Sequence, residues 1–154
     1  MKIDFIKRKR GSFMNYKELS EKAREIKADG ERFLAQYENE IVDFLREDAE
    51  DAESRLQKEI FFEFLDNLHG MCHLAEYMGL EVVKEGVLGL DSQGEMTLDG
   101  DILPLMTEVE VKLYDKEEEQ EIWTRTYVAG AKKRYLVGID RSCPLIGMRA
   151  RMRG

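Results

Sequence analysis

The feature that most constrains this chain is the long stretch over residues 16–78, which contains no proline and only the glycines Gly30 and Gly70. Its apolar residues recur mostly three or four positions apart, and this spacing places them on one face of a helix. These apolar positions are Phe33, Tyr37, Ile41, Phe44, Leu45, Ala49, Ala52, Leu56, Ile60, Phe64, Leu68 and Met71. The pattern predicts helix over almost the whole stretch.

A single straight helix does not fit a chain of this size. A helix over residues 31–69 would be about 58 Å long at about 1.5 Å per residue. Residues 47–53 lack large apolar side chains and place like charges side by side, so they are the expected turning point. We therefore expect an antiparallel helical hairpin, preceded by a short helix over about 16–28, with a dimeric coiled coil as the alternative arrangement.

After Gly79 the pattern changes to short segments in which apolar and polar residues alternate. Turn residues at 91–94 and at 99–100 each predict a β-hairpin. In residues 108–113 the apolar set is Val109, Val111 and Leu113, and the charged set is Glu108, Glu110 and Lys112. This alternation predicts a strand with one buried and one hydrated face.

Together these patterns predict an α+β fold. We expect an N-terminal hairpin of two to three helices, followed by a small antiparallel barrel or sheet of five or six strands, in which the last strand helps to close the sheet. The expected regions are a disordered leader over residues 1–13, with Met14 as the alternative native start, an acidic helical hairpin over 14–79 and a small β-barrel domain over 80–154.

The chain shows no sign of a membrane segment or a secretion signal. Its longest apolar runs are far shorter than the roughly 20 residues that a bilayer requires. The basic N-terminus runs into polar residues instead of an apolar core. We therefore expect a cytoplasmic protein without a membrane partner, in which Cys72 and Cys143 stay reduced.

The formal charge of −8 is unevenly distributed. Residues 14–85 carry nine basic and nineteen acidic side chains, whereas residues 132–154 carry seven basic and one acidic. Acidic surfaces repel nucleic acid and attract basic protein surfaces, whereas basic surfaces can contact phosphate. The candidate partner-binding set is acidic and consists of Glu40, Asp43, Glu47, Asp48, Glu50, Asp51 and Glu53. The candidate nucleic-acid-binding set is basic and consists of Arg125, Lys132, Lys133, Arg134, Arg149 and Arg151.

Residues 86–153 carry short motifs that together resemble a bacterial family. The motif residues are Gly86, Leu88, Gly94, Leu98, Gly100, residues 108–111, Trp123, Arg125, Tyr127, residues 135–138, Leu145, Gly147, Arg149 and Arg151. The series resembles the bacterial domain of unknown function family 5348. The chain departs from that family in its acidic segment 116–119 and in an insertion at 141–144.

This resemblance implies a context and no activity. Domains of that family occur in Gram-positive bacteria, often on mobile elements, and no activity is assigned to them. The resemblance therefore implies a small accessory protein of a plasmid, phage or conjugative element. It does not extend to the acidic helical half.

Potential metal ligands are concentrated at His69, Cys72 and His73. Positions i, i+3 and i+4 share one helical face, so these side chains could chelate a divalent ion. Zinc would need a fourth ligand, such as Cys143 or Glu76. The other interpretation is a small cysteine that faces the core beside partly exposed histidines. We expect no resident cofactor, with zinc as the alternative.

Catalysis is poorly supported by the sequence. Nucleophilic catalysis needs an activated Ser or Cys beside an oriented base, and the side chains of Cys72 and His73 diverge by about 100° on a helix. The carboxylates of residues 47–53 should be solvated and ionised. No glycine-rich phosphate loop with its lysine is present. We therefore expect a protein that is not an enzyme.

Three binding functions remain. In the first, the acidic hairpin occupies a basic surface of a nucleic-acid-processing protein such as a Cas nuclease, as anti-CRISPR proteins do, and acts as an inhibitor or regulator. In the second, the basic set binds nucleic acid while Trp123, Tyr127 or Tyr135 stacks on bases. In the third, residues 61–64 pack on a partner helix. A homodimer through the helical half stays open as well.

Overall fold

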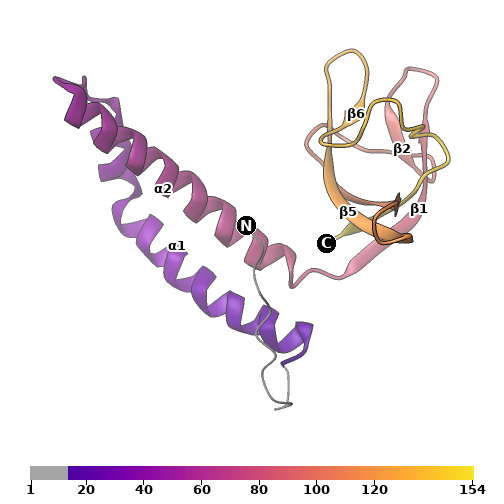
Figure 1. Ribbon diagram of the computed structural model, residues 1–154, viewed down its shortest axis with the longest axis horizontal. Helices are drawn as coiled ribbons and strands as arrows, with labels where there is room; N and C mark the ends of the chain where they lie inside the picture. The colour runs from indigo at the N-terminus through magenta and orange to yellow at the C-terminus, as the bar shows by residue number, and fades with distance from the viewer. Residues whose placement is uncertain (1–13) are drawn as a thin grey trace. The chain divides into compact units, whose positions relative to one another are not determined.

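The computed structural model describes residues 14–154, so the leader predicted for residues 1–13 lies outside the described residues. The described residues divide into two compact units, residues 14–79 and Leu80–Gly154 (Figure 1). The described part of the first unit is helical, and the second is a β-sheet. The predicted α+β fold is confirmed, with two helices followed by a curled antiparallel half-barrel sheet.

The helical unit is an antiparallel hairpin of α1 (Tyr16–Arg46) and α2 (Ala52–Tyr77) (Figure 1). The Asn15 side chain caps α1 by accepting a hydrogen bond from the Glu18 N–H, and the Glu18 carboxylate accepts one from the Asn15 N–H, which makes a capping box. The two helices are separated within residues 47–53, so the predicted turning point is confirmed.

The expected separate helix over 16–28 is wrong, because α1 continues through Gly30 without a break. Gly30 is buried against α2, and a Cβ atom placed there would lie 2.8 Å from the Cys72 Sγ and 3.1 Å from a Leu68 methyl carbon. The glycine therefore allows the two helices to approach closely and does not end α1. Leu34 of α1 and Ala75 of α2 are buried as well.

The second unit is a single antiparallel sheet in the order β3-β2-β1-β7-β4-β5-β6. Its strands are β1 (Val82–Leu90), β2 (Met96–Leu98), β3 (Asp101–Ile102), β4 (Glu108–Asp115), β5 (Gln120–Ala129), β6 (Tyr135–Leu136) and β7 (Arg149–Arg153). Seven strands are one more than the upper predicted number. The additional strand, β3, is only two residues long and is the returning strand of the hairpin predicted at residues 99–100.

The two predicted hairpins are confirmed. Leu90 pairs with Met96 across the first turn, and Leu98 pairs with Asp101 across the second. Gly94 and Gly100 hold positive φ angles of 81° and 85°, which cost a glycine little. These turns bring β1, β2 and β3 together as one half of the sheet.

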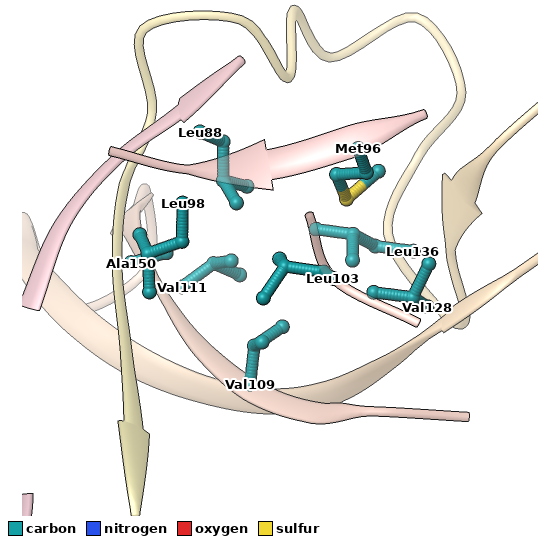
Figure 2. Close-up of a cluster of buried hydrophobic side chains, with 9 residues drawn as sticks. All are labelled: Leu88, Met96, Leu98, Leu103, Val109, Val111, Val128, Leu136 and Ala150. Atoms are coloured by element: carbon teal, nitrogen blue, oxygen red, sulfur yellow. The ribbon is translucent and has the colours of Figure 1, made fainter. Parts of the chain in front are cut away.

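The core of the sheet unit is a cluster of nine buried apolar side chains that converge in the hollow of the half-barrel (Figure 2). They are Leu88, Met96, Leu98, Leu103, Val109, Val111, Val128, Leu136 and Ala150. They come from β1, β2, β4, β5, β6 and β7 and from the connection after β3. Val109 and Val111 are fully buried, so the predicted apolar face of β4 is confirmed.

The prediction that the other face of β4 is hydrated is wrong at Glu110. This residue is only 7% exposed, because β4 is an inner strand that lies between β5 and β7. Its carboxylate accepts hydrogen bonds from the Nε atoms of Arg151 and Arg153 on β7, the latter at 2.7 Å. The charge is therefore buried together with two opposite charges.

Candidate partner-binding surface

The seven acidic residues predicted to bind a partner lie together around the turn of the hairpin. Glu40 and Asp43 occupy the last turns of α1, and Glu53 occupies the first turn of α2. Glu47, Asp48, Glu50 and Asp51 form most of the connection between the helices. All seven are exposed. We call this set the acidic tip.

The carboxylates of the acidic tip form few ion pairs. Among residues 14–154, the ion pairs of the acidic tip are limited to a long one, between Asp43 and Arg46 at 4.0 Å. Both of these side chains are largely exposed, so that pair contributes little. Most carboxylates of the acidic tip are therefore exposed without a cation in direct contact.

One member of the acidic tip has a structural task. Asp51 is the N-cap of α2, where its Oδ1 accepts hydrogen bonds from the Ser54 N–H at 2.8 Å and the Ser54 Oγ–H at 2.5 Å. Hydrogen bonds from the Ser54 side chain and backbone favour the carboxylate and lower the pKa of Asp51. Lys58 holds the other side of the turn, since its Nζ donates to the Phe44 carbonyl and lies over the Phe44 ring.

The lowered pKa of Asp51 predicts an acid-sensitive hairpin. Its stabilising effect is complete above the ordinary pKa of aspartate, about 4, and is lost as pH falls through the lowered value in the folded state. The substitution Asp51→Asn keeps a capping oxygen that does not titrate in this range. We expect the helical circular dichroism of the unmodified protein to fall in acid as Asp51 is protonated. The Asp51→Asn variant should lack this part of the acid transition. Identical acid titrations of the two proteins would contradict this role.

The basic residues predicted to bind nucleic acid are mostly engaged with carboxylates. Arg134 donates through its Nε and Nη2 atoms to Glu95 at 2.8 and 2.9 Å, and its side chain is only 13% exposed. The other pairs are Arg125 with Glu108, Arg149 with Glu85 and Arg151 with Glu110. Lys132 and Lys133 are exposed between β5 and β6, and within residues 14–154 neither forms an ion pair. The structure therefore does not gather the six into one uncompensated surface.

Two of the three aromatic side chains proposed to stack on bases have a guanidinium group over the ring. The Arg151 guanidinium lies 4.1 Å from the centre of the Trp123 ring, and that of Arg141 lies 4.7 Å from the Tyr135 ring. Tyr127 is half-buried on β5. These contacts build the outer layer of the sheet.

The three candidate metal ligands take different environments. His69 Nε2 lies 2.8 Å from a carboxylate oxygen of Glu38, Cys72 is buried against α1, and the His73 ring packs beside Tyr77. Within the part of the chain that the structure describes, no three His, Cys, Asp or Glu side chains are grouped to hold a metal ion. Cys143 lies in the other unit.

The sequence interpretation missed an apolar groove beside the acidic tip. It has a volume of about 410 Å³ and is lined by Phe33, Tyr37, Glu40, Ile41, Phe44 and Phe61. A second groove, of about 470 Å³, lies farther along the same hairpin and is lined in part by Ile26, Met71 and Leu74. The signal for these grooves was present in the sequence, because each helix carries more apolar residues than one contact with the other helix can bury.

Comparison with protein-family models, curated proteins and solved structures finds no match to this chain. The resemblance of residues 86–153 to the domain of unknown function family 5348 therefore stays a prediction. Neither α1 nor α2 combines the length and the hydropathy that crossing a bilayer demands, a finding limited to residues 14–154.

Proposed function

We propose that this protein is a non-enzymatic protein-binding module whose acidic tip binds a basic surface of a partner. The supporting observation is the contrast between its two charged regions. The seven carboxylates of the acidic tip are exposed and nearly uncompensated, whereas four of the six candidate basic residues form ion pairs with carboxylates. An uncompensated field is the one that attracts a partner of opposite charge.

The partner that suits this tip is a cytoplasmic protein that processes nucleic acid. Such proteins carry grooves of lysine and arginine side chains that follow a phosphate backbone. A row of carboxylates along a hairpin can take the place of phosphates in such a groove. The module would then act as an inhibitor or regulator, in the manner of an anti-CRISPR protein on a Cas nuclease. The mobile-element context implied by the resemblance agrees with this role.

A charge-reversal variant tests the proposal. The variant replaces Glu47, Asp48 and Glu50 with lysine and keeps Asp51, because Asp51 caps α2. Placing like charges against a basic partner costs several kcal/mol, so we expect the affinity to fall by about 100-fold or more. The readout is inhibition of DNA cleavage by an RNA-guided nuclease, measured with the nuclease free and after it is loaded with guide RNA.

The chain supplies a matched control on its other unit. Glu117, Glu118 and Glu119 are exposed in the turn between β4 and β5, and replacing them with lysine changes the net charge by the same amount. We expect this control to inhibit as the unmodified protein does. Inhibition should also weaken as salt shortens the screening length to about 8–10 Å or less. Equal losses in both variants would show that net charge matters and the acidic tip does not.

A gel-shift assay with DNA and RNA separates this proposal from the nucleic-acid-binding alternative. We expect no shift at near-physiological salt, since the chain is acidic and most of its candidate arginines are paired. A shift that is lost when Lys132 and Lys133 are replaced with alanine would favour the alternative.

A further inference from the structure

Each helix of the hairpin carries an apolar stripe beside the one that faces the other helix. On α1 the stripe runs through Leu19, Ile26, Phe33, Tyr37 and Phe44, at intervals of seven, seven, four and seven. On α2 it runs through Ile60, Phe64, Met71 and Leu74, at intervals of four, seven and three. Such intervals keep side chains on one side of a helix. The buried residues between the helices, such as Leu34 and Cys72, belong to a different stripe.

The two stripes lie on the same side of the hairpin. The Phe33 and Phe64 rings meet edge to face at 5.6 Å, and the Phe44 and Phe61 rings meet at 5.5 Å. Farther from the acidic tip, Ile26 of α1 shares a groove with Met71 of α2. Together the stripes and Phe61 form one surface, which we call the apolar face.

The opposite side of the hairpin carries charged contacts between the helices. There Glu38 of α1 contacts His69 of α2, and Lys27 lies 3.9 Å from Glu76. Phe62 also lies away from the apolar face, since it precedes Phe64 by two residues, or about 200° around the helix. The hairpin therefore has one side suited to water and one side suited to a protein.

The apolar face is large enough to support a stable interface. Eight of its side chains are exposed by 40–57%: Leu19, Ile26, Tyr37, Ile60, Phe61, Phe64, Met71 and Leu74. A side chain of this size exposes about 200 Å² when it is uncovered, so the eight offer on the order of 800 Å². Standard stable complexes bury about 800 Å² per partner.

We propose that a second copy of this chain covers the apolar face, so that two hairpins form a four-helix bundle. Pairs of helices whose apolar residues are three and four positions apart pack in this way. Each pair then covers the exposed apolar side of the other. The same surface on both copies makes the interface self-complementary under a two-fold axis. This inference is independent of the function proposed for the acidic tip.

The charges along the hairpin select one direction for the second copy. Residues 38–53 carry eight acidic side chains and one basic, whereas residues 16–32 carry five of each. Placing two acidic tips side by side would oppose like charges. The copies therefore run in opposite directions, with each acidic tip beside the neutral end of the other hairpin.

This direction brings the middle of α2 next to its own copy. A two-fold axis perpendicular to the helices stacks α2 on α2, and complete overlap of the two hairpins, which buries the most apolar surface, places that axis at the midpoint of α2. Phe64 lies at this midpoint, as α2 spans Ala52–Tyr77. The two Phe64 side chains therefore approach each other across the axis. If the acidic tips lay at the same end, α2 would instead stack on α1.

The first experiment measures mass in solution by light scattering during size-exclusion chromatography. We expect twice the chain mass of 18.0 kDa for the unmodified protein. Phe64→Asp places a charge in the centre of the interface and should weaken dimerisation on the order of 100-fold. Phe62→Asp is the matched control, because Phe62 is more exposed, at 65% against 45%, but lies off the apolar face. That control should remain a dimer.

The second experiment does not depend on a disruptive substitution. Phe64→Cys and Phe62→Cys are each introduced into a chain with Cys143→Ser and treated with a short bis-maleimide linker. We expect a covalent dimer for Phe64→Cys at a yield at least ten times that of Phe62→Cys and of the parent chain. Cys72, which is buried, is common to all three proteins.

The outcomes separate cleanly. A monomeric unmodified protein at high micromolar concentration overturns the proposal, because another occupant, such as a helix of a different protein, must then cover the face. A dimer that survives Phe64→Asp overturns the interface, and a dimer without the Phe64→Cys cross-link overturns the opposed direction. Failure of the charge-reversal test on the acidic tip leaves these results unaffected.

Discussion

Replacing Leu98 with alanine is expected to destabilise the sheet unit by about 3–4 kcal/mol. Leu98 is completely buried, and it pairs with the equally buried Leu88 across β2 and β1. The substitution removes three carbon atoms from a small core of nine side chains, so few neighbours can move to fill the cavity. A loss of this size is a large share of the stability of a small domain.

The measurement is urea unfolding followed by tryptophan fluorescence. Trp123 is the only tryptophan and lies on β5, so its emission reports on the sheet unit alone. The matched control is Leu90→Ala on β1, where the side chain is 49% exposed. We expect the control to cost less than about 1 kcal/mol. Similar losses for both variants would contradict the assignment of Leu98 to the core.

Replacing Glu110 with alanine is expected to cost about 3 kcal/mol, because it leaves two arginines without their shared carboxylate. Glu110 has a side chain that is 9% exposed, and those of Arg151 and Arg153 are each 20% exposed. Solvent therefore screens these charges only weakly, in contrast to ion pairs at the surface. The loss also removes the carboxylate that fixes Arg151 over the Trp123 ring.

A neighbouring glutamate provides the control for this prediction. Glu121 of β5 forms an ion pair with Lys112 at 2.8 Å, but its side chain is 61% exposed. We expect Glu121→Ala to lose less than about 1 kcal/mol. Glu110→Gln keeps the shape and one acceptor oxygen, so it should fall between the two alanine variants. If Glu110→Ala and Glu121→Ala unfold at the same urea concentration, the buried network adds nothing to stability.

Local signals in the sequence were sufficient for the general course of the chain. The turn of the hairpin was predictable because residues 47–53 combine like charges with a lack of large apolar side chains. The β-hairpins at Gly94 and Gly100 were predictable because short turns with positive φ require particular residues. In both cases, residues close in sequence determine the structure.

Features that depend on distant contacts were not predictable in the same way. A separate helix over residues 16–28 was expected, but α1 continues through Gly30, where Leu68 and Cys72 pack against it despite the low helix propensity of glycine. The alternation in β4 predicted that Glu110 lies on a hydrated face. Nothing in the neighbouring sequence indicates that Arg151 and Arg153, some forty residues later, bind its carboxylate. Both errors have the same origin: a partner far along the chain changes the environment of the residue.

The candidate site was predictable only in part. Exposure of the acidic tip follows from residue type and from its place at a turn, so it agrees with expectation. A count of charges does not predict which arginines form ion pairs. Arg134, just before β6, pairs with Glu95, just before β2, and the two residues are far apart in the sequence. The apolar face was not predicted, because the apolar spacing was interpreted as one stripe on each helix. Each helix carries a second stripe, and these include Phe33 on α1 and Phe64 on α2.

The place of β7 in the sheet has a consequence for how the protein is made. This strand pairs with β1 on one side and with β4 on the other, and it is the last of the seven strands to leave the ribosome. Until it emerges, the nascent chain holds two half-sheets with open edges and a Glu110 that lacks its arginines. The hairpin can form during translation, but the sheet must wait for Arg149–Arg153. A chain that stops just before Arg149 would therefore have an unfolded sheet unit, which quality-control proteases degrade, and not a slightly shortened folded domain.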